Sequence, residues 1–349
     1  MVGSSHSVKG GITTVINQLL GFELNSEFEY KFLPTYFDKN KLTMLCSFIV
    51  ALCKEIVYIL LWKPTMLHVH MSYKGSFTRK KIVCRIAWFF GLPTILHLHG
   101  SEFEAWYKNC SDNKQKKIRT FLLKQKCVIV LGTEWENILK KIDKDINIKV
   151  IHNSVEIPYE RANWNTEQIN VLFLAVLLER KGIYDLINTV NLMLEKYPEL
   201  INKFRFTIAG TGPEEAKAKK IVTEKGLSKY IKFYGWVDKI NKKNLILEHQ
   251  LGWLPSYNEG LPMTILECMS YGVPMLTTPV GSIPSVIKNG KNGLLAKSGD
   301  CVGMLEQLVR INDIETWSKL SDNARLTIKE NFNQEVVLRQ LTKIYRGES

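Results

Sequence analysis

The sequence contains no Cys-x-x-Cys pair, and its seven cysteines are an odd number. Zinc ribbons need cysteines paired at short spacing and disulfide scaffolds need an even set, so the sequence argues against both classes. Fixed-period repeats and low-complexity segments are absent too. With 45% apolar and 23% charged residues, the composition is that of a globular protein, and the cysteine usage favours the reducing cytoplasm.

The sequence also lacks an uncharged apolar run long enough to span a membrane. The most apolar stretch, Leu42–Trp62, is interrupted by Lys54 and Glu55, so its longest uncharged run is shorter than the roughly 20 residues that a transmembrane helix needs. We expect this stretch to form a helix in the core of its domain. The alternative is a helix with one face on the inner surface of the cell membrane, where Trp62 and Lys63 would suit the edge of the interface.

Acidic residues are outnumbered, since 47 Lys and Arg stand against 34 Asp and Glu and give a net charge of +13. Residues 1–160 hold 22 of these basic and 14 of these acidic residues, a net +8. Such an excess indicates anionic partners, namely phosphates, acidic lipid headgroups or nucleic acid. The sequence carries no recognisable RNA- or DNA-binding motif, so we expect no nucleic-acid partner.

Predicted strands alternate with predicted helices along the chain, which is typical of parallel βαβ units. The length of 349 residues favours two domains over one. We therefore expect an α/β fold of two doubly wound, Rossmann-like domains that face each other across a cleft. The first domain is placed at 1–160, the second at 161–330, and a carboxyl-terminal helix that returns toward the first domain at 331–349. The predicted strands and extended segments are 28–33, 66–70, 94–100, 127–130, 148–151, 169–174, 204–209, 231–234, 273–276 and 293–295.

The chain opens on a glycine-rich loop rather than a full strand. Only Met1 and Val2 precede this loop, and an apolar-faced helix follows it. The order is that of a strand-to-helix phosphate loop with a truncated strand, so we expect the native start to lie upstream of Met1. Gly10 and Gly11 would then contact the phosphates. Paired glycines are equally ordinary turn residues, and that alternative stays open.

The most informative stretch runs from Ser256 to Glu267. It follows an apolar run that ends at Pro255, as a buried parallel strand does, and it leads into the apolar face of a helix. Gly260 permits a tight backbone path, and Pro262 is tolerated in a first helical turn. The amino terminus of this helix would present N–H groups to an anion at the carboxyl ends of the strands.

Two carboxylates flank the predicted helix start, Glu259 before it and Glu267 within it. Ionised carboxylates accept strong hydrogen bonds from hydroxyl groups. A phosphate held between two such groups describes a site for a nucleotide sugar. The alternative is a surface loop with two solvated glutamates.

The sequence around this stretch resembles the retaining glycosyltransferase family 4 over essentially the whole carboxyl domain. The residues that carry the resemblance are Leu254-Pro-Ser-x-x-Glu259-Gly-Leu-Pro-x-x-x-Leu-Glu267-x-Met-x-x-Gly272-x-Pro274, Gly281-x-Ile-Pro284, Asn289-Gly-x-Asn-Gly293, Glu179-Arg-Lys-Gly182 and Ile208-Ala-Gly-Thr-Gly-Pro213. The amino domain is similar more loosely, through Lys9-Gly-Gly11, His68-Val-His70 and His97-Leu-His99-Gly100, to the branch that builds bacterial surface polysaccharides. The resemblance implies the GT-B architecture.

The resemblance also implies roles for the candidate residues. Glu259 would hold hydroxyls of the donor sugar beside the N–H groups of Gly260 and Leu261. Glu267 would hold the ribose of the nucleotide. Lys181 would bind the diphosphate, where positive charge stabilises the departing group.

One position departs from the family pattern. An arginine commonly stands five residues before the lysine, and this chain has Val176 there, so Arg180 is the candidate substitute. Gly210 and Gly212 would let the chain turn close to the nucleotide, and Thr264 in the first helical turn is a further donor-binding candidate.

Histidines end two predicted strands of the amino domain. His99 resembles the family histidine that meets the donor sugar across the cleft. His68, His70 and His97 share its sheet, and four histidines on two strands raise the alternative of a metal site. No carboxylate or cysteine joins them at ligand spacing, so we expect core or rim histidines and no metal.

Arg79 and Lys80 stand at a predicted helix start, where cations oppose the helix dipole. A lipid-linked diphosphate on the acceptor would compensate that charge, and a solvated basic turn is the alternative.

We therefore expect a retaining glycosyltransferase that moves a hexose from a nucleotide-diphosphate sugar to a saccharide or lipid-linked acceptor, without a metal or another cofactor. It would act in the cytoplasm, with the inner face of the cell membrane as a candidate docking surface. A sugar-nucleotide epimerase on the same fold and a non-catalytic nucleotide-sugar-binding protein are the alternatives.

Overall fold

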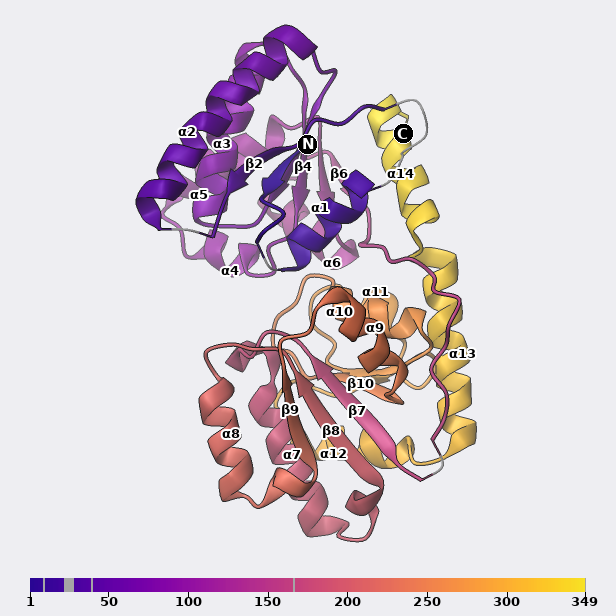
Figure 1. Cartoon of the computed structure of the whole chain (residues 1–349). Helices are drawn as coiled ribbons and strands as arrows, with labels where there is room; N and C mark the ends of the chain where they lie inside the picture. Colours follow the sequence, from indigo (N-terminus) through magenta and orange to yellow (C-terminus); the bar gives the residue numbers. More distant parts are fainter. Residues whose placement is uncertain (9, 22–27, 39, 166, 349) are drawn as a thin grey trace. The chain divides into compact units, whose positions relative to one another are not determined.

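The computed structural model describes residues 1–8, 10–21, 28–38, 40–165 and 167–348. The chain forms two compact units, of which the first comprises Met1–Asn153 with Ile344–Ser349 and the second Ser154–Lys343. Each unit contains one parallel sheet of six strands, with helices on the connections (Figure 1). The expected α/β class with two doubly wound sheets is confirmed.

The first unit has the strand order β2-β1-β3-β4-β5-β6. Its strands are β1 (Val2–Ser4), β2 (Leu33–Tyr36), β3 (Leu67–Met71), β4 (Thr94–Leu98), β5 (Cys127–Val130) and β6 (Ile148–Val150). Its helices are α1 (Gly11–Gly21), α2 (Lys41–Val57) with a π-helical turn (Tyr58–Trp62), α3 (Gly75–Phe89), α4 (Phe103–Lys108), α5 (Asp112–Leu123) and α6 (Thr133–Ile142). Short as it is, β1 lies inside the sheet, where Val2 pairs with both Leu33 and Val69.

The extended segment predicted at 28–33 is misplaced, because β2 begins where that prediction ended. Pro34 stands inside β2, although proline cannot donate a ladder hydrogen bond. An outermost strand tolerates proline, and β2 ends the order of its sheet. The N–H of Leu33 donates to Met1 O at 2.9 Å, which holds the strand in place on its inner side.

The apolar helix α2 is not a core helix, and that prediction is wrong. Of the described residues, one helix is long and apolar enough to cross a membrane, Lys41–Trp62, and only 17% of its apolar window is buried. Its inner face contributes Phe48 and Ala51 to the core of the first unit, and the opposite face is exposed. Composition alone cannot tell the two faces apart, because both are apolar.

Glu55 is buried on the inner face of α2, and its carboxylate oxygens have no hydrogen-bond partner among the described residues. Burial raises the pKa of Glu55 to about 8, and the nearby Lys80 amine of α3 opposes that rise. Burial also lowers the pKa of Lys80 to about 7. The carboxyl group is therefore kept mainly protonated at neutral pH.

The second unit has the strand order β12-β11-β10-β7-β8-β9. Its strands are β7 (Ile169–Leu174), β8 (Phe204–Ala209), β9 (Ile231–Gly235), β10 (Leu251–Leu254), β11 (Met275–Thr277) and β12 (Leu294–Leu295). Its helices are α7 (Ile183–Lys196), α8 (Glu215–Glu224), α9 (Lys239–Leu247), α10 (Met263–Ser270), α11 (Ile283–Val286), α12 (Cys301–Arg310), α13 (Ile314–Asn331) and most of α14 (Gln334–Arg346). The fully buried rings of Phe206 and Trp253 pack with centroids 6.0 Å apart in the core of this sheet.

Residues 156–165, around the predicted boundary between the two domains, form no helix or strand and are held along α13 of the second unit. Arg325 donates to the carbonyls of Pro158 and Glu160, and Arg161 pairs with Asp322 at 2.5 Å. Ala162 N donates to Tyr271 O at 2.9 Å. The second unit accordingly begins at Ser154, a few residues before the predicted boundary.

The burial of Glu55 predicts how its removal changes stability with pH. The folded protein retains this proton up to about pH 8, whereas an unfolded carboxyl loses it near its ordinary value, so stability falls as pH rises through that window. Relative to wild type, Glu55→Gln should gain about 3 kcal/mol of unfolding free energy between pH 5 and pH 8, measured by urea denaturation. Glu199→Gln, an exposed control, should show no such trend, and equal trends in both variants would contradict this account.

Candidate functional site

The strand order of the second sheet reverses between β7 and β10. From β7 the chain continues to β8 on one side, whereas β10 pairs with β7 on the other side, with Leu251 opposite Val171. In open parallel sheets such a reversal leaves a crevice at the carboxyl ends of the two strands, where ligands bind. The loops after β7 and β10 meet at this point.

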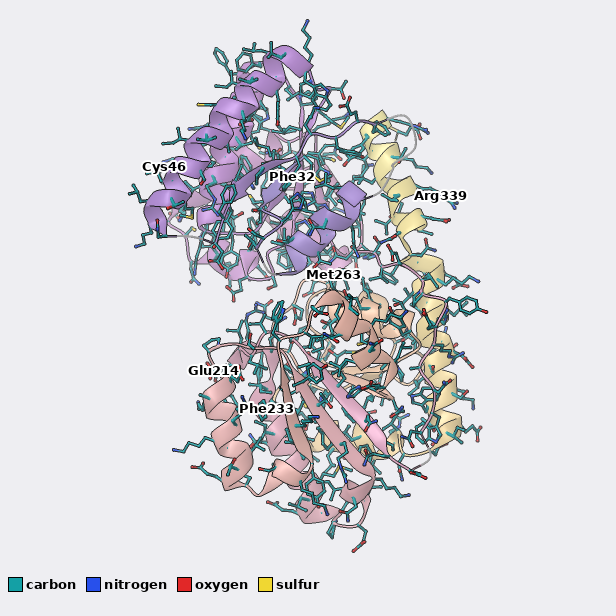
Figure 2. All side chains as sticks on the ribbon, viewed as in Figure 1. Phe32, Cys46, Glu214, Phe233, Met263 and Arg339 are labelled. Atoms are coloured by element: carbon teal, nitrogen blue, oxygen red, sulfur yellow. The ribbon has the colours of Figure 1, made fainter. Side chains whose placement is uncertain are left out.

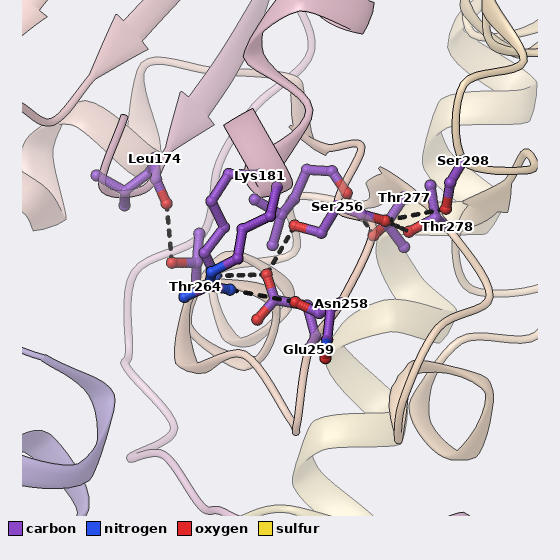
Figure 3. Close-up of polar contacts among 11 residues, drawn as sticks. Leu174, Lys181, Ser256, Asn258, Glu259, Thr264, Thr277, Thr278 and Ser298 are labelled. Carbon is purple, nitrogen blue, oxygen red and sulfur yellow. Dashed lines mark hydrogen bonds and ion pairs between the residues drawn. The ribbon is translucent and has the colours of Figure 1, made fainter. Parts of the chain in front are cut away.

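Glu259 lies at the meeting point of these loops. Its Oε1 accepts from Lys181 Nζ at 2.5 Å and from Ser256 Oγ at 2.7 Å (Figure 3). Both side chains of the ion pair are largely buried, with 15% of Lys181 and 7% of Glu259 exposed. The arrangement places a compensated pair of charges at the switch point of the sheet.

Further hydrogen bonds fix the loop after β10. Thr278 Oγ1 and Ser298 Oγ both donate to Ser256 O, and Thr277 Oγ1 donates to Leu254 O at 2.7 Å (Figure 3). The loop is also tied to the loop after β7, because Arg180 Nη1 donates to Asn258 O at 3.3 Å and Tyr257 N donates to Arg180 O at 2.9 Å. Arg180 therefore links the two loops through hydrogen bonds from its side chain and to its backbone carbonyl.

Glycines let the loops approach each other through their backbones. Gly281 has φ +55°, and a Cβ atom there would lie 1.9 Å from Glu259 O. Gly182 has φ +77°, and its Cβ would lie 2.0 Å from Pro255 O. The tight path predicted at Gly260 is therefore misplaced, because positive φ occurs at Gly281 and not at Gly260. Positive φ depends on the tertiary path, so the residue type alone could not choose between them.

Gly210 and Gly212 follow β8 and pack against the loop after β7. Cβ atoms there would lie 1.9 Å from Ala175 O and 2.3 Å from Leu177 O. Any side chain at Gly210 or Gly212 would therefore clash with the backbone of the loop after β7. Val176, which stands in that same loop, is 45% exposed.

Helix α10 begins at Met263, with Pro262 at the N-cap position rather than in the first turn. No side chain among the described residues caps it. Leu261 is buried just before the helix, and Thr264 Oγ1 donates to Leu174 O at the end of β7 at 3.0 Å. The start of α10 is therefore fastened to the strand end beside Lys181.

Glu267, one turn further along α10, has a partner that the sequence analysis missed. Its Oε1 lies 2.5 Å from Lys242 Nζ of α9. Charge pairing between two helices leaves no fixed spacing in the sequence, so no motif could have indicated Lys242. The pair is partly exposed, with 29% of Lys242 and 16% of Glu267 accessible.

His99 belongs to the first unit and follows β4. Its Nε2 lies 2.8 Å from His70 Nδ1, a hydrogen bond whose direction depends on the tautomers. Burial lowers the pKa of His99 to about 3, so the ring is neutral at physiological pH. His68 makes a similar contact, from its Nδ1 to the hydroxyl of Tyr345 at 2.6 Å.

The histidines of β3 and β4 form a stack rather than a convergent ligand set. Nitrogen atoms of His68, His70 and His97 lie within 4.8 Å of one another. The rings are close to parallel, at 8° between His68 and His97 and 29° between His70 and His97. The lone pair of an imidazole nitrogen lies in the ring plane, so parallel rings direct their lone pairs past each other and not at one ion.

The remaining candidates of the first unit fall at two places. Gly11 starts α1 and Gly10 precedes it with φ +149°, in open space within the unit. Lys9 of the same motif lies outside the described residues. Arg79 stacks on the ring of Tyr36 at 4.8 Å. Lys80 is only 3% exposed and contacts Thr35 Oγ1, so its amine faces the interior and not an external acceptor.

Residues 158–327 match the family model described as glycosyl transferases group 1. Over this stretch, about half of the chain, the resemblance to the group 1 glycosyl transferases is confirmed. The expected enzyme class is confirmed: the chain is a glycosyltransferase. Assignment to family 4 and retention of configuration stay predictions.

Relatives and solved structures agree with the family. The chain is 24% identical to an uncharacterized 41.2 kDa protein in the cps region of Klebsiella pneumoniae, over 98% of each chain. It is 25% identical to a UDP-Gal:alpha-D-GlcNAc-diphosphoundecaprenol alpha-1,3-galactosyltransferase of Escherichia coli, over 85% of this chain and 81% of that protein. Its fold is similar to that of Anabaena HepE in complex with UDP-glucose, with a TM-score of 0.78, 15% identity and coverage of 99% and 98%.

The close backbone approach at Gly281 predicts a specific sensitivity. Gly281→Ala should lower the free energy of unfolding by about 1–3 kcal/mol more than Gly226→Ala, measured by urea denaturation. Gly226 is a matched control because it also has a positive φ, +67°, yet has open space around its Cβ position. Equal losses in the two variants would mean that backbone strain, and not the contact with Glu259 O, requires glycine at 281.

The histidine stack predicts a loss of stability in acid. Its rings stay neutral in the folded protein, whereas unfolded histidines take up protons below about pH 6.5, so stability present above that pH falls as pH drops toward 3. Each such histidine contributes a slope of up to about 1.4 kcal/mol per pH unit. Between pH 7 and pH 5, the free energy of unfolding measured by urea denaturation should fall less in His97→Leu than in wild type. His6→Leu, which changes an exposed ring, is the control and should lose as much as wild type. An unchanged loss in His97→Leu would refute this explanation.

Proposed function

We propose that this glycosyltransferase moves a hexose from a nucleoside-diphosphate sugar to a lipid-linked saccharide during assembly of a bacterial surface polysaccharide, with retention of the anomeric configuration. The observation that carries the proposal is the buried pair of Lys181 and Glu259 at the switch point of the second sheet. The names of the relatives support the substrate class, since one acts on a diphosphoundecaprenol-linked sugar and another is encoded in a cps region.

When a donor binds, its diphosphate would take Lys181 as a partner and its hexose hydroxyls would take Glu259. Without a donor, the Lys181 ammonium and the Glu259 carboxylate compensate each other at 2.5 Å. With a donor, the ammonium turns to the diphosphate and the carboxylate accepts hydroxyl hydrogen bonds from the hexose. Both charges then keep a partner in a site where an unpaired charge is costly.

Transfer requires stabilisation of the nucleoside diphosphate as it leaves. Lys181 supplies positive charge, and the uncapped amino terminus of α10 supplies N–H groups and the positive end of a helix dipole. Arg180 adds a second cation beside them, although its hydrogen bond to Asn258 O gives it a structural duty as well. Attack on the same face as the departing diphosphate, with that group accepting the proton of the acceptor hydroxyl, retains the configuration without a covalent enzyme intermediate.

The nucleotide would lie toward α9, where Glu267 accepts from the ribose hydroxyls. The ammonium of Lys242 holds the Glu267 carboxylate at 2.5 Å and so sets its orientation. His99 would contact the donor sugar from the first unit as a neutral hydrogen-bonding group. We also propose that the enzyme works at the cytoplasmic face of the membrane, where a lipid-linked acceptor is found.

Substitution of Glu259 tests the proposed role of the buried pair. Glu259→Gln should lower kcat/KM by about a hundredfold or more, because the charge that orients both the sugar and Lys181 is lost. Nucleoside diphosphate release and product mass should be followed with each common nucleotide sugar and extracted membrane lipid. Glu215→Gln, on the surface helix α8, is the matched control.

Three outcomes of this assay count against the proposal. A Glu259→Gln enzyme with the wild-type rate would contradict the role of the carboxylate. Conversion of the nucleotide sugar without any acceptor would indicate an epimerase. Donor binding with no turnover in the wild type would indicate a binding protein, for which Val176 in place of the usual arginine would be the explanation.

Glu267 should affect binding more than chemistry. Glu267→Gln should raise KM for the nucleotide sugar by about tenfold to a hundredfold, the equivalent of charge-assisted hydrogen bonds to the ribose, and change kcat much less. Lys242→Met should raise KM in the same direction by a smaller factor, since it frees the orientation of the carboxylate. A fall in kcat with an unchanged KM in Glu267→Gln would place this carboxylate at the reacting centre instead.

A further inference from the structure

The outward face of α2 and its π-helical turn is apolar along its whole length. Exposed side chains follow one another on this face over 22 residues, a length of about 33 Å. They include Leu42, Leu45, Ile49, Val57, Leu60 and Leu61, of which Leu61 is 80% exposed. Helices on the surface of a soluble domain usually turn a polar face to water, so this face needs a partner.

The fold of the first unit does not supply that partner. The inner face of α2 already packs into the core through Phe48 and Ala51. Figure 1 shows α2 along the outer side of its unit, and Cys46, labelled in Figure 2, is exposed on it. The apolar surface continues onto α3, which packs against α2 and presents Phe89 with 84% exposure.

The charges along this face are mainly positive, although an exposed carboxylate, Glu29, pairs at 3.4 Å with Lys31, whose ammonium lies over the Trp62 ring. Lys41, Lys54 and Lys63 are exposed along it, and the only carboxylate in the sequence between Lys41 and Lys63 is Glu55, which points into the core. On α3, Lys81 lies close enough to Arg85 and to Lys117 of α5 for both cations to lower its pKa in addition to its burial. An anionic partner is therefore favoured.

Two other occupants fit these observations less well. A second copy of the chain, joined by a twofold axis, would bring the same lysines together, and the exposed Glu29 carboxylate at the Trp62 end already pairs with Lys31. A membrane-spanning helix would have to leave the sheet and carry Lys54 and Glu55 through the hydrocarbon. A bilayer surface, by contrast, offers acyl chains to the leucines and anionic headgroups to the lysines at once.

We propose that α2 docks the first unit on an anionic phospholipid bilayer, lying in the plane of the membrane with its leucine and isoleucine face at the acyl boundary. Trp62, over whose ring the Lys31 ammonium lies at 5.5 Å, and Lys63 stand at the headgroup level. This surface explains how a soluble fold reaches a lipid-linked acceptor, and in that respect it rests on the proposed function. Vesicle binding is measured without turnover, so failure of either proposal leaves the other testable.

The first test is flotation of the full-length protein with vesicles. Wild type should float with vesicles that contain phosphatidylglycerol and much less with phosphatidylcholine alone. Ile49→Glu with Leu60→Glu should lower the partition coefficient between vesicles and water by about tenfold or more. The reason is that two apolar side chains that the proposal places in the acyl boundary are replaced by charged ones. Ile240→Glu with Ile314→Glu is the matched control, since it changes two exposed isoleucines of the second unit by the same charge.

The electrostatic part is tested separately. Lys54→Gln with Lys63→Gln should lower binding to phosphatidylglycerol vesicles by about fivefold per lysine, without an effect on phosphatidylcholine vesicles. Circular dichroism and thermal unfolding should confirm that every variant is folded, which the exposure of the changed side chains favours.

The second test uses Cys46 and Cys53, which are exposed on the proposed docking face. An environment-sensitive fluorophore on these thiols should shift to shorter wavelength when phosphatidylglycerol vesicles are added. Cys46→Ser with Cys53→Ser should abolish that shift.

The proposal fails if wild type does not bind anionic vesicles, or if the Ile49 and Leu60 variant binds them as well as wild type. It also fails if the face is covered in a stable dimer that this variant dissociates.

Discussion

The contact between Lys181 and Glu259 is possible only because two loops from different strands reach the same point of the second unit. A buried ion pair needs a close fit, since the loss of hydration is recovered only at short distance and with further hydrogen bonds. The fit here depends on backbone touching backbone, at Gly281 beside Glu259 O and at Gly182 beside Pro255 O. Ser256 then supplies the additional hydrogen bond to the carboxylate. Gly182, Gly281 and Ser256 thus all support that one contact.

The two units solve the burial of polar groups in opposite ways. The second unit holds charged side chains as pairs, Lys181 with Glu259 and Lys242 with Glu267. The first unit stacks four imidazoles, of which His68, His70 and His97 are buried and His99 is partly buried, and Tyr345 from the end of α14 packs edge-on against His68. A stack of neutral rings can be buried without a counter-ion, whereas buried charges are tolerated only when each has a partner.

Sequence patterns predicted what depends on local order and failed where tertiary packing decides. Strands at 127–130, 169–174 and 204–209 lie where they were predicted, because buried parallel strands are continuous apolar runs between turn signals. The outward face of α2 and the buried amine of Lys80 contradicted expectation, since an apolar residue or a lysine does not encode which way it faces. The role of Lys242 could not be predicted for a related reason, because its partner Glu267 lies 25 residues away on another helix.

Pro34 has a consequence for the first unit beyond the placement of its strand. The N–H of Leu33 points inward to Met1 O, so the next residue in β2 would point its own N–H outward, along the open side of the sheet. Proline has no such donor, and a foreign strand that approached would find a gap in the ladder it needs. Pro34 thereby disfavours edge-to-edge pairing of a second chain along β2, in a unit that also exposes the apolar face of α2.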